Sequence, residues 1–148
     1  MVPDRGLDPE LVERRLRRMR ELLDFLGARR PLTADELAAD LATQLAVGKG
    51  LELLVEMAYA INSHVSIAGG GLPPDDYRSS FAAAASAGAI SEELAERLAP
   101  SAGLRNVLVH EYLAVDFAQV SDALDEGVDD FRRYVEQVAR YVRDRFQG

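Results

Sequence analysis

The chain has 148 residues, 48% hydrophobic and 28% charged, a balance typical of a soluble helix-rich protein, so we expect residues 1–148 to form one domain. The absence of cysteine excludes disulfide bonds, thiolate-held metal ions and a thiol nucleophile. With 17 Lys and Arg against 25 Asp and Glu, the net charge is −8, so any contact with RNA or DNA has to be local. No apolar run approaches the roughly 18 residues of a membrane span, and the N-terminus lacks a signal-type apolar core. We therefore expect a cytoplasmic protein without membrane contact.

The first predicted helix covers residues 9–26. Apolar residues recur there at helical spacing, and Gly27 ends the pattern. The tract "ERRLRRMR" within it places Arg14, Arg17 and Arg18 opposite the apolar stripe. This pattern favours a solvated face, with a role in steering RNA as the alternative.

A second, long helix is expected from residue 34 to about residue 68. It follows "TADE" (residues 33–36), which has the form of a capping box. The tract "VGKG" (residues 47–50) weakens its middle, because each glycine costs about 1 kcal/mol relative to alanine inside a helix. Either the helix kinks there or another segment packs closely against it.

The second half of the chain alternates loops with shorter helical segments. "GGGLPPDD" (residues 69–76) is a loop signal, and Pro100 kinks or restarts the helix that begins at Ser91. Further helices are expected over residues 77–87, 101–112 and 117–146. Since no segment shows the alternation of a strand, we predict an all-α fold, an up-and-down bundle of four-helix type with one or two short accessory helices.

The stretch "AGLRNVLVHEY" (residues 102–112) places several polar side chains in an otherwise apolar run. On an ideal helix they share one broad face, while the leucines point the other way. Arg105 and His110 lie about 140° apart around the axis and about 7.5 Å apart along it, so they flank this face. Asn106 and His110, four residues apart, are neighbours, and Tyr112 lies near the helix end.

This set of side chains suits the cleavage of RNA without a metal ion. Histidine exchanges protons near neutral pH, and arginine binds phosphate through a fork of donors. An imidazole can activate the ribose 2′-hydroxyl while a guanidinium stabilises charge on the phosphorus oxygens. On spacing alone, however, an ordinary helix end with an arginine, a tyrosine and a boundary histidine explains the pattern better.

A resemblance to a known family changes this balance. "RNVLVHEY" resembles the motif of the HEPN superfamily, an arginine, a polar residue, three further residues and a histidine, and Tyr112 extends it as in the HepT-like toxin branch. "LELLVEMAYAINSHV" (residues 51–65) is similar to the second helix of that branch, and "VD" follows the motif as usual. The likeness covers about residues 33–140. Lys49, between two glycines, stands where the branch often has a basic residue.

The resemblance implies a helical bundle that forms a homodimer, with both motifs facing one cleft as a composite site that cleaves an RNA substrate. By that resemblance Arg105 and His110 are catalytic and Asn106 supports them. It also implies a partner, an MNT-type nucleotidyltransferase antitoxin that neutralises the toxin and can transfer AMP to Tyr112. No cofactor is implied.

The remaining candidates support simpler interpretations. His64, the only other histidine, is expected to be partly buried and hydrogen-bonded. Glu52 and Glu56 do not indicate a di-iron site, because no Glu-x-x-His occurs in the chain, and we predict no metal ligands. Two functional alternatives remain: a catalytically silent HEPN module that binds a nucleotidyltransferase, and a generic dimeric scaffold. The intact Arg, His and Tyr favour the nuclease, and the charge of −8 favours the silent module.

Overall fold

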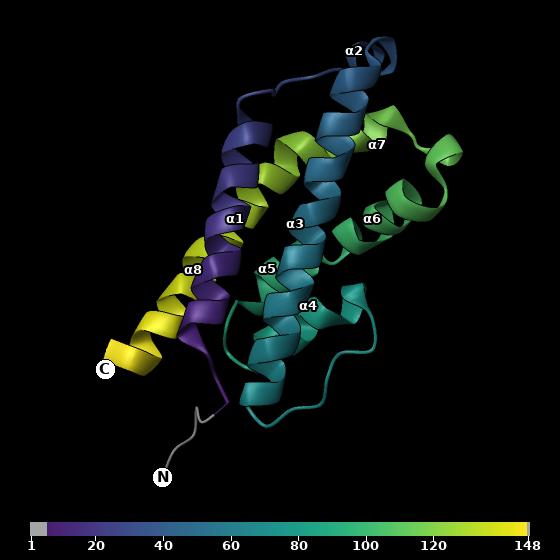
Figure 1. The fold of residues 1–148 in the computed structure, drawn as a ribbon. Helices are drawn as coiled ribbons and strands as arrows, with labels where there is room; N and C mark the ends of the chain where they lie inside the picture. Colours follow the sequence, from purple (N-terminus) through teal and green to yellow (C-terminus); the bar gives the residue numbers. More distant parts are fainter. Residues whose placement is uncertain (1–5, 148) are drawn as a thin grey trace.

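The computed structural model describes residues 6–147, and Figure 1 shows them as a bundle of helices. The helices in chain order are α1 (Pro9–Gly27), α2 (Ala34–Ala39), α3 (Leu41–Ala68), α4 (Tyr77–Ser86), α5 (Glu92–Leu98), α6 (Pro100–His110), the 3-10 helix η1 (Tyr112–Ala114), α7 (Phe117–Asp122), the π-helical segment η2 (Ala123–Gly127) and α8 (Val128–Gln147). No strand occurs in residues 6–147, so the predicted all-α fold is confirmed. Within this range no helix combines the length and the apolar character needed to cross a membrane.

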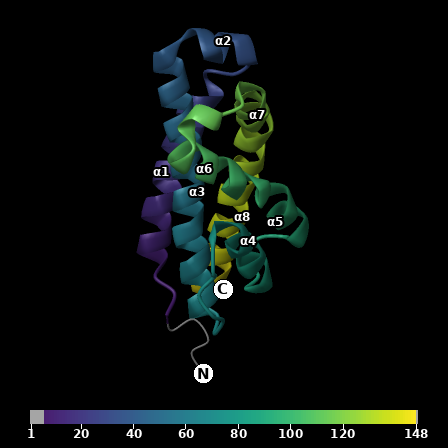
Figure 2. The same ribbon diagram turned by 90° about the vertical axis from the view of Figure 1, so that its right-hand side faces the viewer.

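Helix α3 occupies the centre of the bundle. Helix α1 packs on one side of it and α6 on the other, while α4 covers its lower half (Figure 1). Helix α8 runs beside α1 and also contacts α5. The short helices α2 and α7 contact each other at the upper end of the bundle (Figure 2). The motif of residues 105–110 therefore lies on the opposite side of α3 from the arginine-rich α1.

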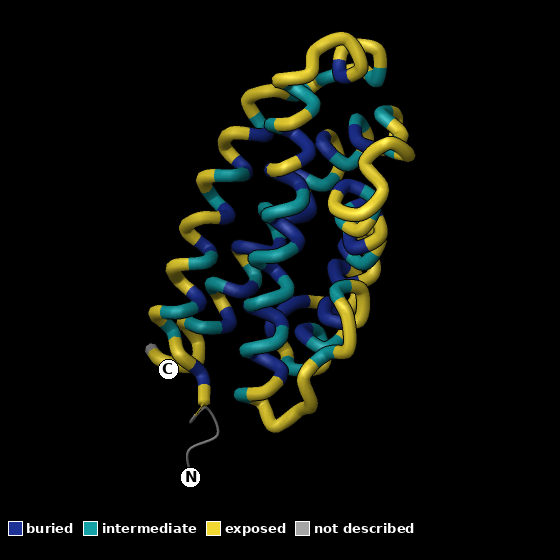
Figure 3. The backbone as a smooth tube through the Cα atoms, turned by 45° about the vertical axis from the view of Figure 1, so that its right-hand side comes forward, coloured by how far each residue is buried: buried dark blue, intermediate teal, exposed yellow. Residues whose placement is uncertain are grey.

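Helix α1 shows how the apolar periodicity becomes the core. Buried and exposed residues alternate along its tube in Figure 3 with the spacing of a helix that has one apolar face. The buried residues are Val12, Leu16, Met19, Leu23 and Leu26. Asp8 caps the helix, and its backbone N–H donates to Nε2 of His64 at 2.9 Å. The prediction that His64 is a satisfied, partly buried side chain is confirmed.

A buried aromatic cluster joins α3, α4 and α8. The rings of Phe81, Phe131 and Tyr134 meet edge to face at centroid distances of 6.2–6.4 Å. The Tyr134 hydroxyl donates to Oδ1 of Asn62 at 2.6 Å, and Nδ2 of Asn62 donates to Oγ of Ser80 at 3.0 Å. Burial raises the pKa of Tyr134 well above its usual value, so the phenol stays a neutral donor. The polar groups of this core are thus satisfied by one another.

The predicted long helix over residues 34–68 is wrong in one respect, because it breaks at Asp40. This residue has extended backbone angles (φ −135°, ψ 105°), and its carboxylate accepts the backbone N–H of Ala42 at 3.2 Å and the Thr43 hydroxyl at 2.6 Å. The hydroxyl bond is the main cause that lowers the pKa of Asp40. Asp40 therefore ends α2 and caps α3, a use of aspartate that competes with continuing a helix.

Two further boundaries differ from the prediction. Helix α6 ends at His110, where Glu111 leaves helical geometry (φ −134°, ψ 47°). Tyr112 therefore belongs to η1 and not to the motif helix. The final helical run begins at Phe117 as predicted, but it passes through the π-helical turn of η2 and extends to Gln147.

The glycines of "VGKG" allow close packing. Helix α3 runs unbroken through them, and of the two predicted alternatives close packing is confirmed. A Cβ atom on Gly50 would lie 2.8 Å from Cδ2 of Leu26, a fully buried side chain of α1. A Cβ atom on Gly48 would lie 3.5 Å from Cδ2 of Leu108 on α6, an ordinary contact. Gly50 thus lets α1 approach α3 more closely than any other residue would.

We expect Gly50→Ala to lower the free energy of unfolding by about 1 kcal/mol, because overpacking against Leu26 outweighs the gain in helix propensity. Gly48→Ala, two residues away, should leave the stability unchanged or raise it by up to about 1 kcal/mol. Urea denaturation followed by circular dichroism measures both. Equal effects of the two substitutions would contradict the close-packing explanation.

Candidate functional site

Helix α6 carries the motif and is fixed by its apolar side. Leu104 and Leu108 are buried against the bundle, as the helical pattern predicts. Leu108 approaches Gly48, whereas Arg105 contacts Glu56, so α6 runs toward the N-terminal end of α3. This register sets which α3 residues the polar face of α6 meets.

Arg105 lies in a socket formed by α3, α4 and α6. Oε2 of Glu56 accepts Nη2–H at 3.1 Å and Nε–H at 3.3 Å, and Oδ1 of Asn106 accepts Nη1–H at 3.2 Å. The guanidinium carbon stacks over the Tyr77 ring, 4.3 Å from its centroid. Tyr59 supports that ring from α3, with centroids 4.5 Å apart. The guanidinium is therefore held by Glu56 at its Nε/Nη2 edge, by Asn106 at Nη1 and by Tyr77 on one face.

Two N–H groups of Arg105 have no hydrogen-bond partner in residues 6–147. A guanidinium has five N–H donors, and the three hydrogen bonds above use one on each nitrogen, which leaves one on Nη1 and one on Nη2. This pair is the kind of donor set that binds two oxygens of one phosphate group. The socket thus fixes the guanidinium in an orientation that could bind an oxyanion.

His110 is placed differently, at the exposed last position of α6. Among residues 6–147, none forms a hydrogen bond or an ion pair with its imidazole. Asn106, one turn earlier on the helix, is also exposed and directs its Oδ1 to Arg105. The structure therefore brings Arg105 and Asn106 together and leaves His110 open to solvent.

Tyr112 lies beyond the end of α6, so the prediction that it belongs to the motif helix is wrong. Its side chain is 40% exposed, and neighbouring Leu113 is fully exposed. Val109, on the last turn of α6, is exposed as well. We call Val109, Tyr112 and Leu113 the apolar tip of the motif.

Sequence reasoning missed two residues of the socket. Glu56 was considered only as a metal ligand together with Glu52, yet Glu52 pairs with Lys49 at 3.0 Å and Glu56 pairs with Arg105. The sequence indicates only that Tyr77 belongs to a short helix. In the part of the chain that the structure describes, no group of three or more His, Asp or Glu side chains is arranged to hold a metal ion.

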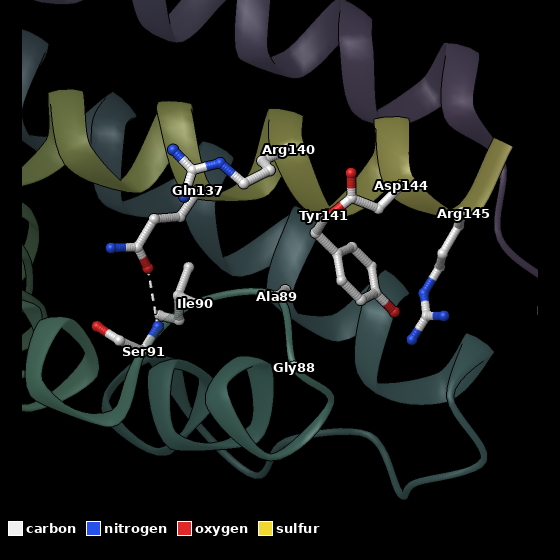
Figure 4. A pocket seen from close by; sticks show the side chains of 9 residues that line it. All are labelled: Gly88, Ala89, Ile90, Ser91, Gln137, Arg140, Tyr141, Asp144 and Arg145. Carbon is white, nitrogen blue, oxygen red and sulfur yellow. Dashed lines mark hydrogen bonds between the residues drawn. The ribbon is translucent and has the colours of Figure 1, made fainter. Parts of the chain in front are cut away.

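A hollow much larger than the cavity at Arg105 lies elsewhere on the surface (Figure 4). It measures about 730 Å³, lies between the α4–α5 connection and α8, and has no lining residue from α6 or η1. Gln137 reaches across it to accept the backbone N–H of Ser91 at 2.8 Å, and the Arg145 guanidinium stacks on Tyr141. By contrast, a cavity of only about 30 Å³ touches Arg105, on the apolar side of α6, and Glu56, Tyr77 and Asn106 are not among the residues that line it.

Comparison with known proteins extends the likeness over nearly the whole chain. The family model described as ribonuclease HepT-like matches residues 12–138. The tRNA nuclease HepT of Aphanizomenon flos-aquae is 31% identical over 140 residues, which cover 93% of this chain and 93% of that protein.

Solved structures share the fold. A tri-AMPylated HEPN toxin of Shewanella oneidensis in complex with an MNT antitoxin has a TM-score of 0.77 and 20% identity, covering 88% of this chain and 97% of that one. A toxin–antitoxin complex with AMP-PNP has a TM-score of 0.74 and 19% identity, covering 86% of this chain and 97% of that one. Since the family model spans most of the chain and a relative of similar length is 31% identical, the chain belongs to the ribonuclease HepT-like family of HEPN proteins.

Proposed function

We propose that this chain is a toxin-type RNA endonuclease that cleaves without a metal ion, with Arg105 and His110 as its catalytic residues and Asn106 as a supporting residue. Membership of the family makes it a ribonuclease. The observation that carries the assignment of residues is the Arg105 socket, in which a partly buried guanidinium has two N–H donors without a partner in residues 6–147, on the same helix as an exposed imidazole. RNA is the substrate in this proposal.

The proposed reaction uses the ribose as its own nucleophile. His110 accepts the proton of the 2′-hydroxyl, the 2′-oxygen attacks the adjacent phosphorus, and the 5′-oxygen of the next nucleotide leaves with a proton. The products are a 2′,3′-cyclic phosphate and a 5′-hydroxyl. Arg105 stabilises the charge that develops on the phosphorus oxygens, and a fixed donor does this without reorganising during the reaction.

A second copy of the chain completes the site in this proposal. Within one chain Arg105 and His110 lie about 140° apart around α6, and none of the described residues bonds to the His110 imidazole. The apolar tip exposes Val109, Tyr112 and Leu113 beside them. Pairing two copies across this face would cover the apolar tip, and the two His110 side chains could serve as base and acid.

An MNT-type nucleotidyltransferase antitoxin is the proposed protein partner. The Tyr112 oxygen would attack the α-phosphorus of ATP, which releases pyrophosphate and leaves AMP on the phenol. Exposure of Tyr112 beyond the end of α6 supports this role, because the partner can reach it without unfolding a helix. The added phosphate would bring negative charge to the rim of the site and compete with RNA there.

A catalytically silent module that binds the nucleotidyltransferase is the second candidate. It is favoured by the ion pair itself, since Glu56 already neutralises Arg105, and by the net charge of −8. Cleavage assays on the purified chain separate the two candidates.

We expect the isolated protein to cleave RNA in the presence of EDTA, because neither catalytic group needs a metal ion. His110→Ala should abolish cleavage, and Arg105→Ala should reduce its rate by about a hundredfold or more, the scale of losing one preorganised donor. His64→Ala is the matched control, since it removes the other histidine and should retain cleavage. Full activity of His110→Ala would refute the assignment.

We expect a homodimer at micromolar concentration, measured by light scattering. Leu113→Asp should weaken both the dimer and cleavage, because it places charge in the apolar tip. A monomer that cleaves RNA at the wild-type rate would contradict this arrangement.

Co-expression with the partner nucleotidyltransferase should add adenylyl groups to the protein and abolish cleavage. Tyr112→Phe should keep most of the nuclease activity and escape this control, because it loses the acceptor oxygen and keeps the ring. Intact-mass spectrometry measures the adduct. An equal adduct on Tyr112→Phe would remove Tyr112 from the mechanism.

A further inference from the structure

We infer that Glu56 is a positioning residue for the reaction: its carboxylate fixes the Nε/Nη2 edge of Arg105 so that the remaining N–H on each terminal nitrogen faces the scissile phosphate. This inference rests on the proposed function. It starts from the two contacts of Oε2 of Glu56 with Arg105, at 3.1 and 3.3 Å, which tie α3 to α6 across 49 residues of sequence.

The burial of this pair distinguishes it from the other ion pairs. The side chains of Arg105 and Glu56 are 14% and 30% exposed. Every other ion pair found in residues 6–147 has at least one side chain that is more than 40% exposed. Exposed pairs hold their side chains weakly because water competes for both partners. The Arg105–Glu56 pair is therefore the one best placed to fix a geometry.

The other contacts of the guanidinium complete the restraint that Glu56 begins. Tyr77 covers one face and Asn106 accepts from Nη1, so rotation about the last torsions of Arg105 breaks a contact in either direction. A free arginine side chain has many rotamers, and binding a phosphate would have to restrict them. In the socket they are restricted before RNA arrives.

Holding Arg105 with a carboxylate has opposite effects on binding and on turnover. The negative charge of Glu56 opposes the approach of an RNA phosphate, so it weakens binding of the ground state. The fixed orientation places two donors where charge develops, so it accelerates the chemical step. A positioning role therefore predicts a separation of the two constants: removing the charge of Glu56 should lower kcat and leave KM unchanged or lower it.

The first measurement is a double-mutant cycle on RNA cleavage with Glu56→Gln, Arg105→Ala and the double variant. Glu56→Gln keeps the shape of the side chain and should lower the rate at saturating RNA by about tenfold to a hundredfold. In the Arg105→Ala background the same change should have no further effect, because Glu56 acts through Arg105. Glu52→Gln is the matched control, since Glu52 lies one turn from Glu56 on α3 and its carboxylate pairs with Lys49. This substitution should change the rate less than about twofold.

The second measurement does not depend on activity. The Nε–H resonance of Arg105 in 15N-labelled protein, assigned by its loss in Arg105→Lys, should be protected from exchange with water. It should shift and exchange faster in Glu56→Gln and stay unchanged in Glu52→Gln. A resonance unaffected by Glu56→Gln would overturn the inference, whatever the nuclease activity.

The two measurements also separate the inference from the proposed function. Additive losses in the cycle, in a wild type that cleaves RNA, would overturn the positioning role alone. A wild type that cleaves no RNA, while the Arg105 resonance still depends on Glu56, would overturn the proposed function and with it the catalytic part of the inference. A fall in kcat that merely follows lost thermal stability would also overturn it.

Discussion

The fold depends on the burial of α3 between α1, α4 and α6, because a helix with neighbours on several sides must satisfy each of them locally. Gly50 admits Leu26 of α1, and Gly48 faces Leu108 of α6. Further along, Asn62 bonds with both the α4 and the α8 side of the core. Once Leu108 lies against Gly48, Arg105 lies one turn earlier on α6, toward the C-terminal end of α3, and its side chain reaches Glu56. The position of the candidate site is thus a consequence of apolar packing.

The positions of single charged side chains, and not the net charge, decide where this molecule could bind an anion. The net charge of −8 gives no general attraction for a polyanion, and Arg14, Arg17 and Arg18 lie exposed on α1, across α3 from the motif helix (Figure 1). Arg105 itself is balanced by Glu56. In the proposed complex, two N–H groups of Arg105 would bind the RNA phosphate, and the net charge of the protein would add little attraction. Selection of the substrate would therefore depend on how well the phosphate fits these donors.

The features that depend on residues close together in the sequence could be predicted from the sequence. The buried faces of α1 and α6 followed from helical spacing, and His64 was recognised as a bonded side chain. The break at Asp40 was missed because helix-forming residues stand on both sides of one capping carboxylate. The end of α6 was missed because no glycine or proline marks it. The Arg105 socket joins residues 49 positions apart, and no spacing rule connects Glu56 to Arg105.

The boundary at His110 divides the motif into a fixed and an adaptable part. Arg105, in the body of α6, is held by α3 and α4, which suits its proposed role of stabilising developing charge, since a donor that must reorganise loses most of its effect. His110 ends the helix, and Tyr112 follows the change of backbone direction at Glu111. A group that transfers protons has to reach its partner, and a group that is modified has to reach an enzyme, so both suit an exposed helix end. None of the described residues of the chain bonds to the His110 imidazole, and this is the physical reason why we propose that a second copy completes the site.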